Sequence, residues 1–249
     1  MGVQGIFTKS ADTALLNGKI DIAVHSLKDV PTLVPEGLVQ AAVLKRDSPL
    51  DILVFKNTPT FLKNRQSVAT IATCSIRRKA QWLHRFPNHR IENLRGNVNT
   101  RLQKLHDNAW DGAIFAAAGL ERIHLRPENS LNLDWMLPAP AQGAITAVCR
   151  DEDAWIKTAC QPLNDPMTAL CTKIERDFLR TLSGGCSTPI AALANVKGDN
   201  IVLKGNICSM DGVEKMDIEE RQPIRFAEHL GIIAAHNILL KGAERLKFA

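Results

Sequence analysis

Several features that would assign the chain to a common class are missing from its sequence. No run of apolar residues reaches the length of a membrane-spanning helix, and no charged segment followed by an apolar one marks a secretory signal. No basic run is interleaved with aromatic residues, which argues against a nucleic-acid-binding protein. Internal repeats and low-complexity tracts are also absent. We therefore expect no membrane and no nucleic acid among the partners of this protein.

The cysteines lack any metal-binding or disulfide pattern. Six occur, at positions 74, 149, 160, 171, 186 and 208, and no two of them have the spacing C-x-x-C. No histidine spacing completes a zinc site. Because free thiols are typical of a reducing compartment, the sequence predicts a cytoplasmic protein without a bound metal.

The composition is that of an ordinary globular protein. The chain has 249 residues, of which 45% are hydrophobic and 23% are charged, and this is enough for two or three domains with a core each. The formal net charge of +5 is mild and spread along the chain. Such a protein, with arginines grouped at loop positions, suits a small polyanionic substrate.

The clearest secondary-structure pattern lies between Val68 and Gly119. Strand-like segments at 68–72, 91–94 and 113–117 alternate with two amphipathic helical segments, the first of them capped by Ser75. This β-α-β-α-β order predicts a parallel sheet with right-handed crossovers. Elsewhere we expect strands at 20–25, 38–44, 145–149, 191–196 and 201–208, and helices at 10–17, 168–182 and 226–246, the last with a break near Gly231.

Arginines follow the carboxyl end of each strand in this predicted sheet. Ligands of such sheets bind at that edge, and arginine forks bind carboxylates through two parallel hydrogen bonds. Surface helices also carry arginines merely for solvation, but the confinement of these arginines to one edge favours a polycarboxylate or phosphate site. The set consists of Arg77, Arg78, Arg95, Arg101 and Arg122.

Two other segments carry groups suited to chemistry. Cys186 lies between two glycines and a proline just after a helix, which leaves its sulfur open, although a helix end with an incidental small residue is the alternative. Lys28 and Asp29 follow the carboxyl end of the strand predicted at 20–25. The Asp29 carboxyl group could protonate a leaving amine; alternatively, the two residues form a surface ion pair. A cysteine protease would need a histidine base, and the sequence assigns none: His25 is as readily a structural residue.

Taken together, these segments resemble the hydroxymethylbilane synthase family, also called porphobilinogen deaminases, of tetrapyrrole biosynthesis. The similar segments are the family's catalytic-aspartate signature, its carboxylate-binding arginine motifs, its Gln-Gly-Ala hinge and its cofactor-attachment loop. They stand in the family's order, at residues 21–31, 73–78, 94–97 with Arg101, 140–144 and 182–190.

The resemblance implies a transferase that condenses four porphobilinogen molecules head to tail, with release of ammonia, to the linear tetrapyrrole hydroxymethylbilane. It also implies a monomer of class α/β, with two periplasmic-binding-protein-like α/β domains around a cleft plus a small C-terminal α+β domain. Pro138–Ala144 and Asn164–Pro166 are typical of domain crossings. The expected boundaries are 1–46 with 141–163 for domain 1, 47–140 for domain 2 and 164–249 for domain 3.

The resemblance further implies a role for each site residue. Asp29 and Lys28 are expected to be catalytic, and a dipyrromethane cofactor is expected to be covalently attached to Cys186 through a thioether. The residues expected to bind this cofactor are Cys186, Lys28, Asp29, Thr73, Ser75, Arg77, Arg78, Arg95 and Gly96. The residues expected to bind substrate are Phe7, Arg95, Arg101 and Arg122.

The sequence departs from the family pattern in two places. Cys74 stands where the family usually has serine. Family members also carry several dozen residues before the segment that begins here at Gly5, including a first strand with a Thr-Arg-x-Ser-type motif and a lid. We therefore expect a truncated chain that retains cofactor attachment in part and loses much of its turnover. The alternative is a non-catalytic, two-lobed polycarboxylate-binding protein, in which Cys186 would have no role.

Overall fold

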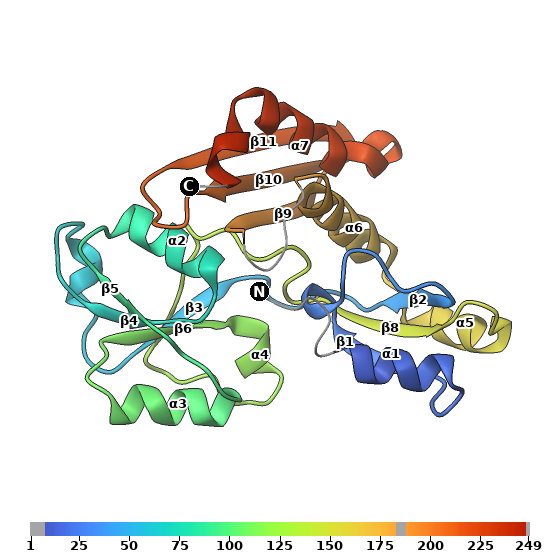
Figure 1. Ribbon diagram of the computed structural model, residues 1–249, viewed down its shortest axis with the longest axis horizontal. Helices are drawn as coiled ribbons and strands as arrows, with labels where there is room; N and C mark the ends of the chain where they lie inside the picture. The colour runs from blue at the N-terminus through green and yellow to red at the C-terminus, as the bar shows by residue number, and fades with distance from the viewer. Residues whose placement is uncertain (1–7, 183–187, 248–249) are drawn as a thin grey trace.

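The computed structural model describes residues 8–182 and 188–247, and the strands of these residues form three separate sheets (Figure 1). Their orders are β1-β8-β2, β5-β4-β6-β3-β7 and β11-β10-β9. The third sheet lies above the other two in Figure 1, with α6 on the side of the first sheet and α2 on the side of the second. The expected architecture of two α/β domains and a small C-terminal domain is confirmed.

The first sheet is antiparallel and is built around β8 (Ile145–Arg150), which pairs with β1 (Ala23–Ser26) and β2 (Leu38–Val43). Successive residues of β8 face opposite sides of the sheet. Ala147 packs with α5 on one side, and Val148 packs with α1 on the other. The helices are α1 (Lys9–Leu16) and α5 (Ala154–Cys160). Strand β1 begins at Ala23, later than expected, because residues 20–22 pair with no strand in the described part of the chain.

The second sheet contains the predicted parallel unit. Strands β4 (Thr70–Ala72), β5 (Arg90–Glu92) and β6 (Gly112–Ala116) are parallel, with β4 in the middle. Two antiparallel strands that the pattern did not predict, β3 (Asp51–Phe55) and β7 (Ser130–Asn132), extend this sheet beyond β6. The helices are α2 (Ile76–Arg85), α3 (Val98–Asp107) and α4 (Ala117–Glu121).

Two hydrophobic clusters, one on each face, hold the second sheet between its helices. Trp82 of α2 is fully buried against Leu53 and Ile71, whereas Leu105 of α3 packs on the other face with Ile52. Truncation of a buried tryptophan such as Trp82 to alanine costs about 3–5 kcal/mol. The sheet is therefore a rigid base for the loops at its carboxyl edge.

The third sheet is covered on one face by two helices. Its antiparallel strands are β9 (Ile190–Lys197), β10 (Asn200–Cys208) and β11 (Lys215–Pro223), and the helices are α6 (Pro166–Thr181) and α7 (Leu230–Leu240). A Cβ at Gly205 would lie 2.6 Å from the ring of Phe178, so that α6 can approach β10 only over a glycine.

The helix predicted at 226–246 is interrupted near Gly231, as expected, because α7 begins only at Leu230, but the α-helix also ends earlier than predicted. A 3₁₀ segment (Ile224–His229) precedes α7, and a second one (Ala243–Lys247) follows Gly242, whose φ of +93° ends the α-helix. No helix among the described residues is long and apolar enough to cross a membrane.

Candidate active site

The Lys28–Asp29 pair lies in a 3₁₀ turn (Leu27–Asp29) directly after β1. Leu27 is fully buried and anchors the turn, while Asp29 is exposed and Lys28 half-buried. The turn ends at Val30, whose extended backbone (φ −79°, ψ 132°) is the conformation that the following Pro31 requires. The local sequence thus presents the Asp29 carboxylate at the end of a strand.

Arg176 of α6 holds this turn from behind. Its Nη1 donates hydrogen bonds to the carbonyl oxygens of Leu27 (3.1 Å) and Val30 (2.9 Å), and its Nη2 donates to that of Pro31 (2.6 Å). Burial lowers the pKa of Arg176 to about 10, which leaves the guanidinium charged at neutral pH. No sequence motif marks this residue, which lies 149 positions from Leu27 and on a helix of the third domain.

Lys28 points toward the hinge segment between the first two sheets. Its Nζ donates to Oε1 of Gln142 at 3.2 Å. Burial is the main reason that the pKa of Lys28 falls to about 8, and the positive charge of Arg78 lowers it further against the opposing effects of Asp29 and Asp51. The ammonium therefore predominates at neutral pH but is lost in mildly alkaline solution.

Gln142 connects Lys28 with the second sheet. Its Nε2 donates to Oδ1 of Asp51 at 2.9 Å and to the carbonyl oxygen of Pro49 at 2.8 Å, while its Oε1 accepts from Lys28. Each polar atom of this buried amide thus has a partner, which fixes its orientation. The resulting chain Lys28–Gln142–Asp51 joins the Asp29 turn to the carboxyl edge of the parallel strands.

The hinge backbone around Gln142 is held in an unusual conformation. Ala141 has a φ of +62° and Gly143 a φ of +88°, and a Cβ at Gly143 would lie 2.7 Å from the carbonyl oxygen of Ser48. The buried carboxylate of Glu175 accepts from the Ala141 amide (2.7 Å) and pairs with Arg46 (2.6 Å). These contacts offset the backbone strain and tie the hinge to α6.

Asp51 is fully buried and pairs with both arginines of the first turn of α2. Its Oδ1 accepts from Nε (3.0 Å) and Nη2 (2.8 Å) of Arg78, and its Oδ2 lies 2.8 Å from Nη1 of Arg77. Burial alone would raise the pKa of Asp51, but the charges of Arg77 and Arg78 hold it well below the usual range of a carboxyl. The sequence pattern did not identify Asp51, because it lies on β3, which was not predicted.

The start of α2 is organised by two predicted site residues. The Ser75 hydroxyl accepts from the Arg78 amide at 3.4 Å, as expected of a helix cap, and the buried Thr73 hydroxyl accepts from the Ser75 amide at 3.2 Å. The Cys74 side chain between them is exposed. The turn thereby directs Arg77 and Arg78 inward, to exposed fractions of 6% and 7%.

The remaining arginines differ from this buried pair. Arg95 is exposed and Arg101 half-buried, and neither pairs with an acidic side chain in the described part of the chain. Gly96 is also exposed, with a φ of +122° that opens the loop before α3. Arg122 donates to Asp47 (2.7 Å) and to the carbonyl oxygen of Gly143 (2.6 Å). Of the five arginines expected at this edge, Arg77 and Arg78 are therefore the buried ones, and Arg95, Arg101 and Arg122 are more exposed.

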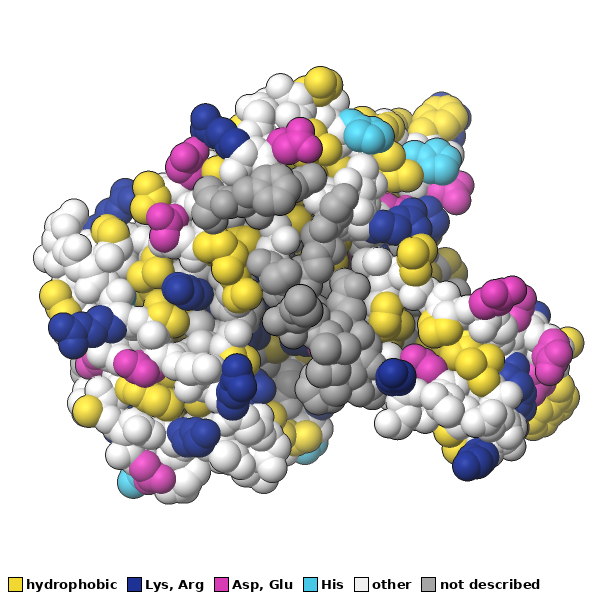
Figure 2. Space-filling model, in the orientation of Figure 1, with side chains coloured by type: hydrophobic (Ala, Val, Ile, Leu, Met, Phe, Trp, Pro, Cys, Tyr) yellow, Lys and Arg dark blue, Asp and Glu magenta, His cyan; other side chains and the backbone are white. Residues whose placement is uncertain are grey.

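Two buried donors of this region have no acceptor among residues 8–182 and 188–247. They are Nε of Arg77 and Nε of Arg101. Leaving such a donor unsatisfied costs about 1–3 kcal/mol. Figure 2 shows the lobe of the second sheet at the left and that of the first at the right, and Gln142 connects the two. Phe7 and Cys186 lie outside the described residues, and no metal-binding group was found within them.

These features define a class: an α/β protein with a small C-terminal domain, in which cationic side chains and one exposed carboxylate gather where two sheets meet. Comparison with known proteins identifies the family. The model "Porphobilinogen deaminase, dipyromethane cofactor binding domain" matches residues 1–158, and "Porphobilinogen deaminase, C-terminal domain" matches residues 169–240. The chain belongs to the porphobilinogen deaminase family, whose members are transferases of tetrapyrrole biosynthesis that act on porphobilinogen.

Curated relatives agree with this assignment. The chain is 40% identical over 248 residues to the porphobilinogen deaminase of Syntrophotalea carbinolica, and the match covers 99% of this chain and 78% of that protein. It is 38% identical to that of Desulforamulus reducens (99% and 80% covered) and 39% identical to that of Legionella pneumophila strain Lens (98% and 80%).

The chain also matches parts of solved structures at low sequence identity. For the BvgS VFT2 domain of Bordetella pertussis the TM-score is 0.37 at 12% identity, with 60% of this chain and 63% of that chain covered. For a putative L-cystine ABC transporter protein of Listeria monocytogenes the TM-score is 0.37 at 13% identity, with 66% and 68% covered.

The residues present fit the family's dipyrromethane cofactor, whose pyrrole rings carry acetate and propionate groups. Carboxylates need charged donors, and the Lys28 ammonium and the unsatisfied Nε of Arg77 supply them from two different sheets. Thr73 and Ser75 add hydroxyl groups beside Arg77. This donor set is chemically suited to an anionic ligand with several carboxylates.

Proposed function

We propose that the chain catalyses the stepwise head-to-tail condensation of four porphobilinogen molecules, with release of ammonia, to hydroxymethylbilane. The observation that carries the proposal is the bonded chain Lys28–Gln142–Asp51, which joins the Asp29 turn to the arginines of α2. When bound, dipyrromethane supplies the pyrrole carbon at which chain growth begins. The protein's own residues bind carboxylates, orient rings and move protons.

Asp29 is the proposed catalytic carboxylate. It is exposed at the end of β1, and Arg176 restrains the backbone on either side of it through three hydrogen bonds. A carboxylate held in this way can stabilise the positive charge that develops on a pyrrole nitrogen and can transfer a proton to the leaving amine. Lys28, the neighbouring cation, would bind a carboxylate and balance the charge of Asp29.

The two sets of arginines are proposed to serve two ligands. The cofactor carboxylates would be held by Arg77 and Arg78, with Thr73 and Ser75. Both arginines pair with Asp51, which Gln142 connects to Lys28. The more exposed residues would receive porphobilinogen as it enters. These are Arg95, Arg101 and Arg122, of which Arg95, together with Gly96 beside it, is also proposed to contact the cofactor.

Cys186 is proposed to attach the cofactor through a thioether. The described end of α6 supports this assignment, because Arg176 and Leu182 are separated by six residues of helix and helix end, a rise of about 9 Å. The segment that carries Cys186 therefore begins near the residue that restrains the Asp29 turn. Phe7 is proposed, from the family resemblance, to pack against a pyrrole ring.

We further propose the domain boundaries 1–46 with 141–163, 47–140 and 164–249. The grouping of β1, β2 and β8 into one sheet supports the first of these, and the separate third sheet supports the last. We also propose a cytoplasmic monomer that binds no nucleic acid. The unpaired cysteines support the compartment.

The decisive experiment measures the intact mass of the purified chain together with its rate of hydroxymethylbilane formation. We expect a mass surplus of two linked pyrrole units, present in Cys74→Ser and absent in Cys186→Ser, and turnover only where the surplus is present. A chain that lacks the surplus yet binds porphobilinogen would instead be a non-catalytic polycarboxylate-binding protein. A surplus that persists in Cys186→Ser would contradict the assignment of that residue.

A further inference from the structure

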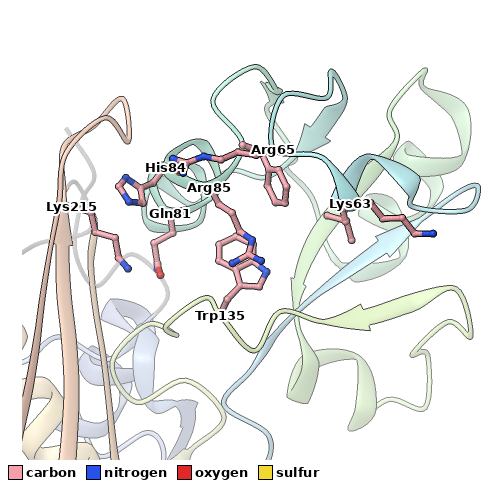
Figure 3. Close-up of a pocket in the computed structure, with 9 residues that line it drawn as sticks. Lys63, Arg65, Gln81, His84, Arg85, Trp135 and Lys215 are labelled. Atoms are coloured by element: carbon pink, nitrogen blue, oxygen red, sulfur yellow. Dashed lines mark hydrogen bonds between the residues drawn. The ribbon is translucent and has the colours of Figure 1, made fainter.

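A second basic pocket lies at the opposite end of α2 from the proposed active site. It has a volume of about 420 Å³ and is open between the second sheet and the third domain (Figure 3). Arg77 lies in the first turn of α2, whereas Arg85 is its last residue, and eight residues of helix separate them by about 12 Å. None of the residues assigned to the active site lines this pocket. The pocket is lined by residues that include Arg65, Arg85, Phe86, Trp135 and Lys215.

The lining of the pocket is cationic and contains no acidic side chain. Arg65 and Arg85 make no ion pair with any acidic residue that the structure describes, although one N–H group of Arg65 donates to the His84 carbonyl (2.9 Å). Lys215 pairs with the exposed Asp217 at 2.8 Å, so that it stays near the rim. An excess of positive charge in a concave site attracts small anions.

Aromatic rings make one wall of the pocket. The guanidinium carbon of Arg85 lies 4.7 Å from the ring centre of Trp135 and 5.7 Å from that of Phe86, and Figure 3 shows Arg85 extended toward Trp135. Stacking fixes the plane of the guanidinium and leaves its N–H edge available for a carboxylate or phosphate. A flat ligand can stack on the same surface.

The wall is held rigidly against α2. Gln81 accepts from the Leu137 amide (2.9 Å) and donates to the Leu137 carbonyl (2.9 Å), which fixes the segment that follows Trp135. On the opposite side, Nδ1 of His84 donates to the carbonyl oxygen of Gly212 at 3.0 Å and links α2 to the turn before β11. The site is therefore formed before any ligand binds, which lowers the entropic cost of binding.

We propose that this pocket binds a small planar anion, namely a ring system that carries at least two negative charges on carboxylate or phosphate groups. The ring would stack beside Arg85 and Trp135, and its anionic groups would reach Arg65 and Lys215. The volume of the pocket lies in the range of about 300–1,000 Å³ that is typical of small-molecule sites. Because Arg85 and Lys215 belong to different domains, such a ligand would bind across the contact between α2 and β11.

The test is calorimetric titration of the full chain with three probes: benzene-1,3-dicarboxylate, cyclohexane-1,3-dicarboxylate and AMP. We expect the aromatic dicarboxylate to bind better than its cyclohexane analogue, and each of Arg85→Gln and Lys215→Gln to weaken binding about tenfold or more. Arg90→Gln, which removes an exposed arginine of β5 outside the pocket, should leave the affinity unchanged. The comparison with AMP distinguishes a carboxylate ligand from a phosphate ligand.

Arg101→Gln serves as the second control, because it changes the proposed active site and leaves this pocket intact. Binding lost in Arg101→Gln but kept in Arg85→Gln would place the probe in the active site and overturn the proposal. Absence of binding by all three probes at 10 mM, about the limit of weak specific binding, would overturn it as well. Neither result bears on whether Cys186 carries a cofactor, so failure here is separable from failure of the proposed function.

Discussion

The first two strand-to-helix loops of the parallel sheet have the same local design and use their arginines in opposite ways. Ser75 caps α2 and Asn97 caps α3, each by accepting a backbone hydrogen bond within the first turn. Behind the first cap, Arg77 and Arg78 are buried against Asp51; beside the second, Arg95 is exposed. The difference arises from strand order. Strand β4 lies inside the sheet, and the arginines that follow it reach Asp51 on β3, two strands away, whereas β5 is an edge strand.

The largest effect should follow from breaking the buried cluster. Asp51→Asn leaves two buried arginines without their carboxylate, and we expect the free energy of unfolding to fall by about 3–5 kcal/mol. Urea denaturation at pH 7 measures this change in the free energy of unfolding. The pKa of Asp51 is lower in the folded state than the ordinary value of 3.8. Its contribution to the free energy of unfolding is therefore complete above pH 3.8 and is lost as the pH falls below that value. A difference between the wild type and Asp51→Asn that already narrows between pH 7 and pH 5 would contradict this account.

Removal of an open arginine should instead affect substrate binding alone. Arg95→Gln and Arg101→Gln each remove a charged donor with no acidic partner in the described structure. We expect kcat/KM for porphobilinogen to fall about 10- to 100-fold, equivalent to about 1.5–3 kcal/mol, through KM more than kcat. Urea denaturation should show no loss of stability in either variant. A clear loss of stability in either variant would show that the second loop is as structural as the first.

Arg176 tests a third use of an arginine, in which the acceptors are backbone carbonyl oxygens. Arg176→Gln keeps one donor group and loses the fork that bonds three carbonyls of the Asp29 turn, so the turn should become less ordered. We expect kcat to fall about tenfold, or about 1.4 kcal/mol, with little change in KM, because the hydrogen bonds of Arg176 go to the backbone of the turn. Steady-state kinetics decide it: an increase in KM without a change in kcat would be the opposite result.

Lys28 should produce a pH dependence rather than a loss of structure. Its pKa is lowered to about 8, so the ammonium is present below that pH and is lost above it. Carboxylates of a bound ligand can only raise this value. We therefore expect kcat/KM to decline in alkaline solution with a midpoint at or above pH 8. Lys28→Arg should remove the decline, because a guanidinium stays protonated to about pH 12; an unchanged profile would assign the decline to another group.

The smallest effect should come from the exposed counterpart of the Asp51 cluster. Asp47 pairs with Arg122 at 2.7 Å, but the Asp47 side chain is 52% exposed. We expect Asp47→Asn to change the free energy of unfolding by less than about 1 kcal/mol. Thermal and urea denaturation of Asp47→Asn and Asp51→Asn in parallel compare the loss of stability at an exposed and at a buried aspartate–arginine pair. Equal losses of stability in the two variants would show that burial does not distinguish the two aspartate–arginine pairs.

Much of the second sheet could be predicted because its signals are local. The apolar spacing and the cap at Ser75 lie within a few residues of the helix that they specify, and α2 begins at Ile76 as expected. The helix expected to run to residue 246 ends at Leu240 instead, because Gly242, inside the apolar pattern, has a positive φ that ends the α-helix. Strand β7 has one apolar residue, Leu131, between Ser130 and Asn132, and a single apolar residue gives neither an apolar run nor an alternation.

By itself, the sequence determined the order of strands and helices in the parallel unit, the caps, the family and the identity of the groups that can do the chemistry. Only the tertiary structure decided which arginines are already paired. Asp51, Gln142 and Arg176 reach their partners across 27, 114 and 149 positions of the chain. Such contacts depend on strand order and on the packing of α6 against the Asp29 turn, and no spacing between neighbouring residues encodes them.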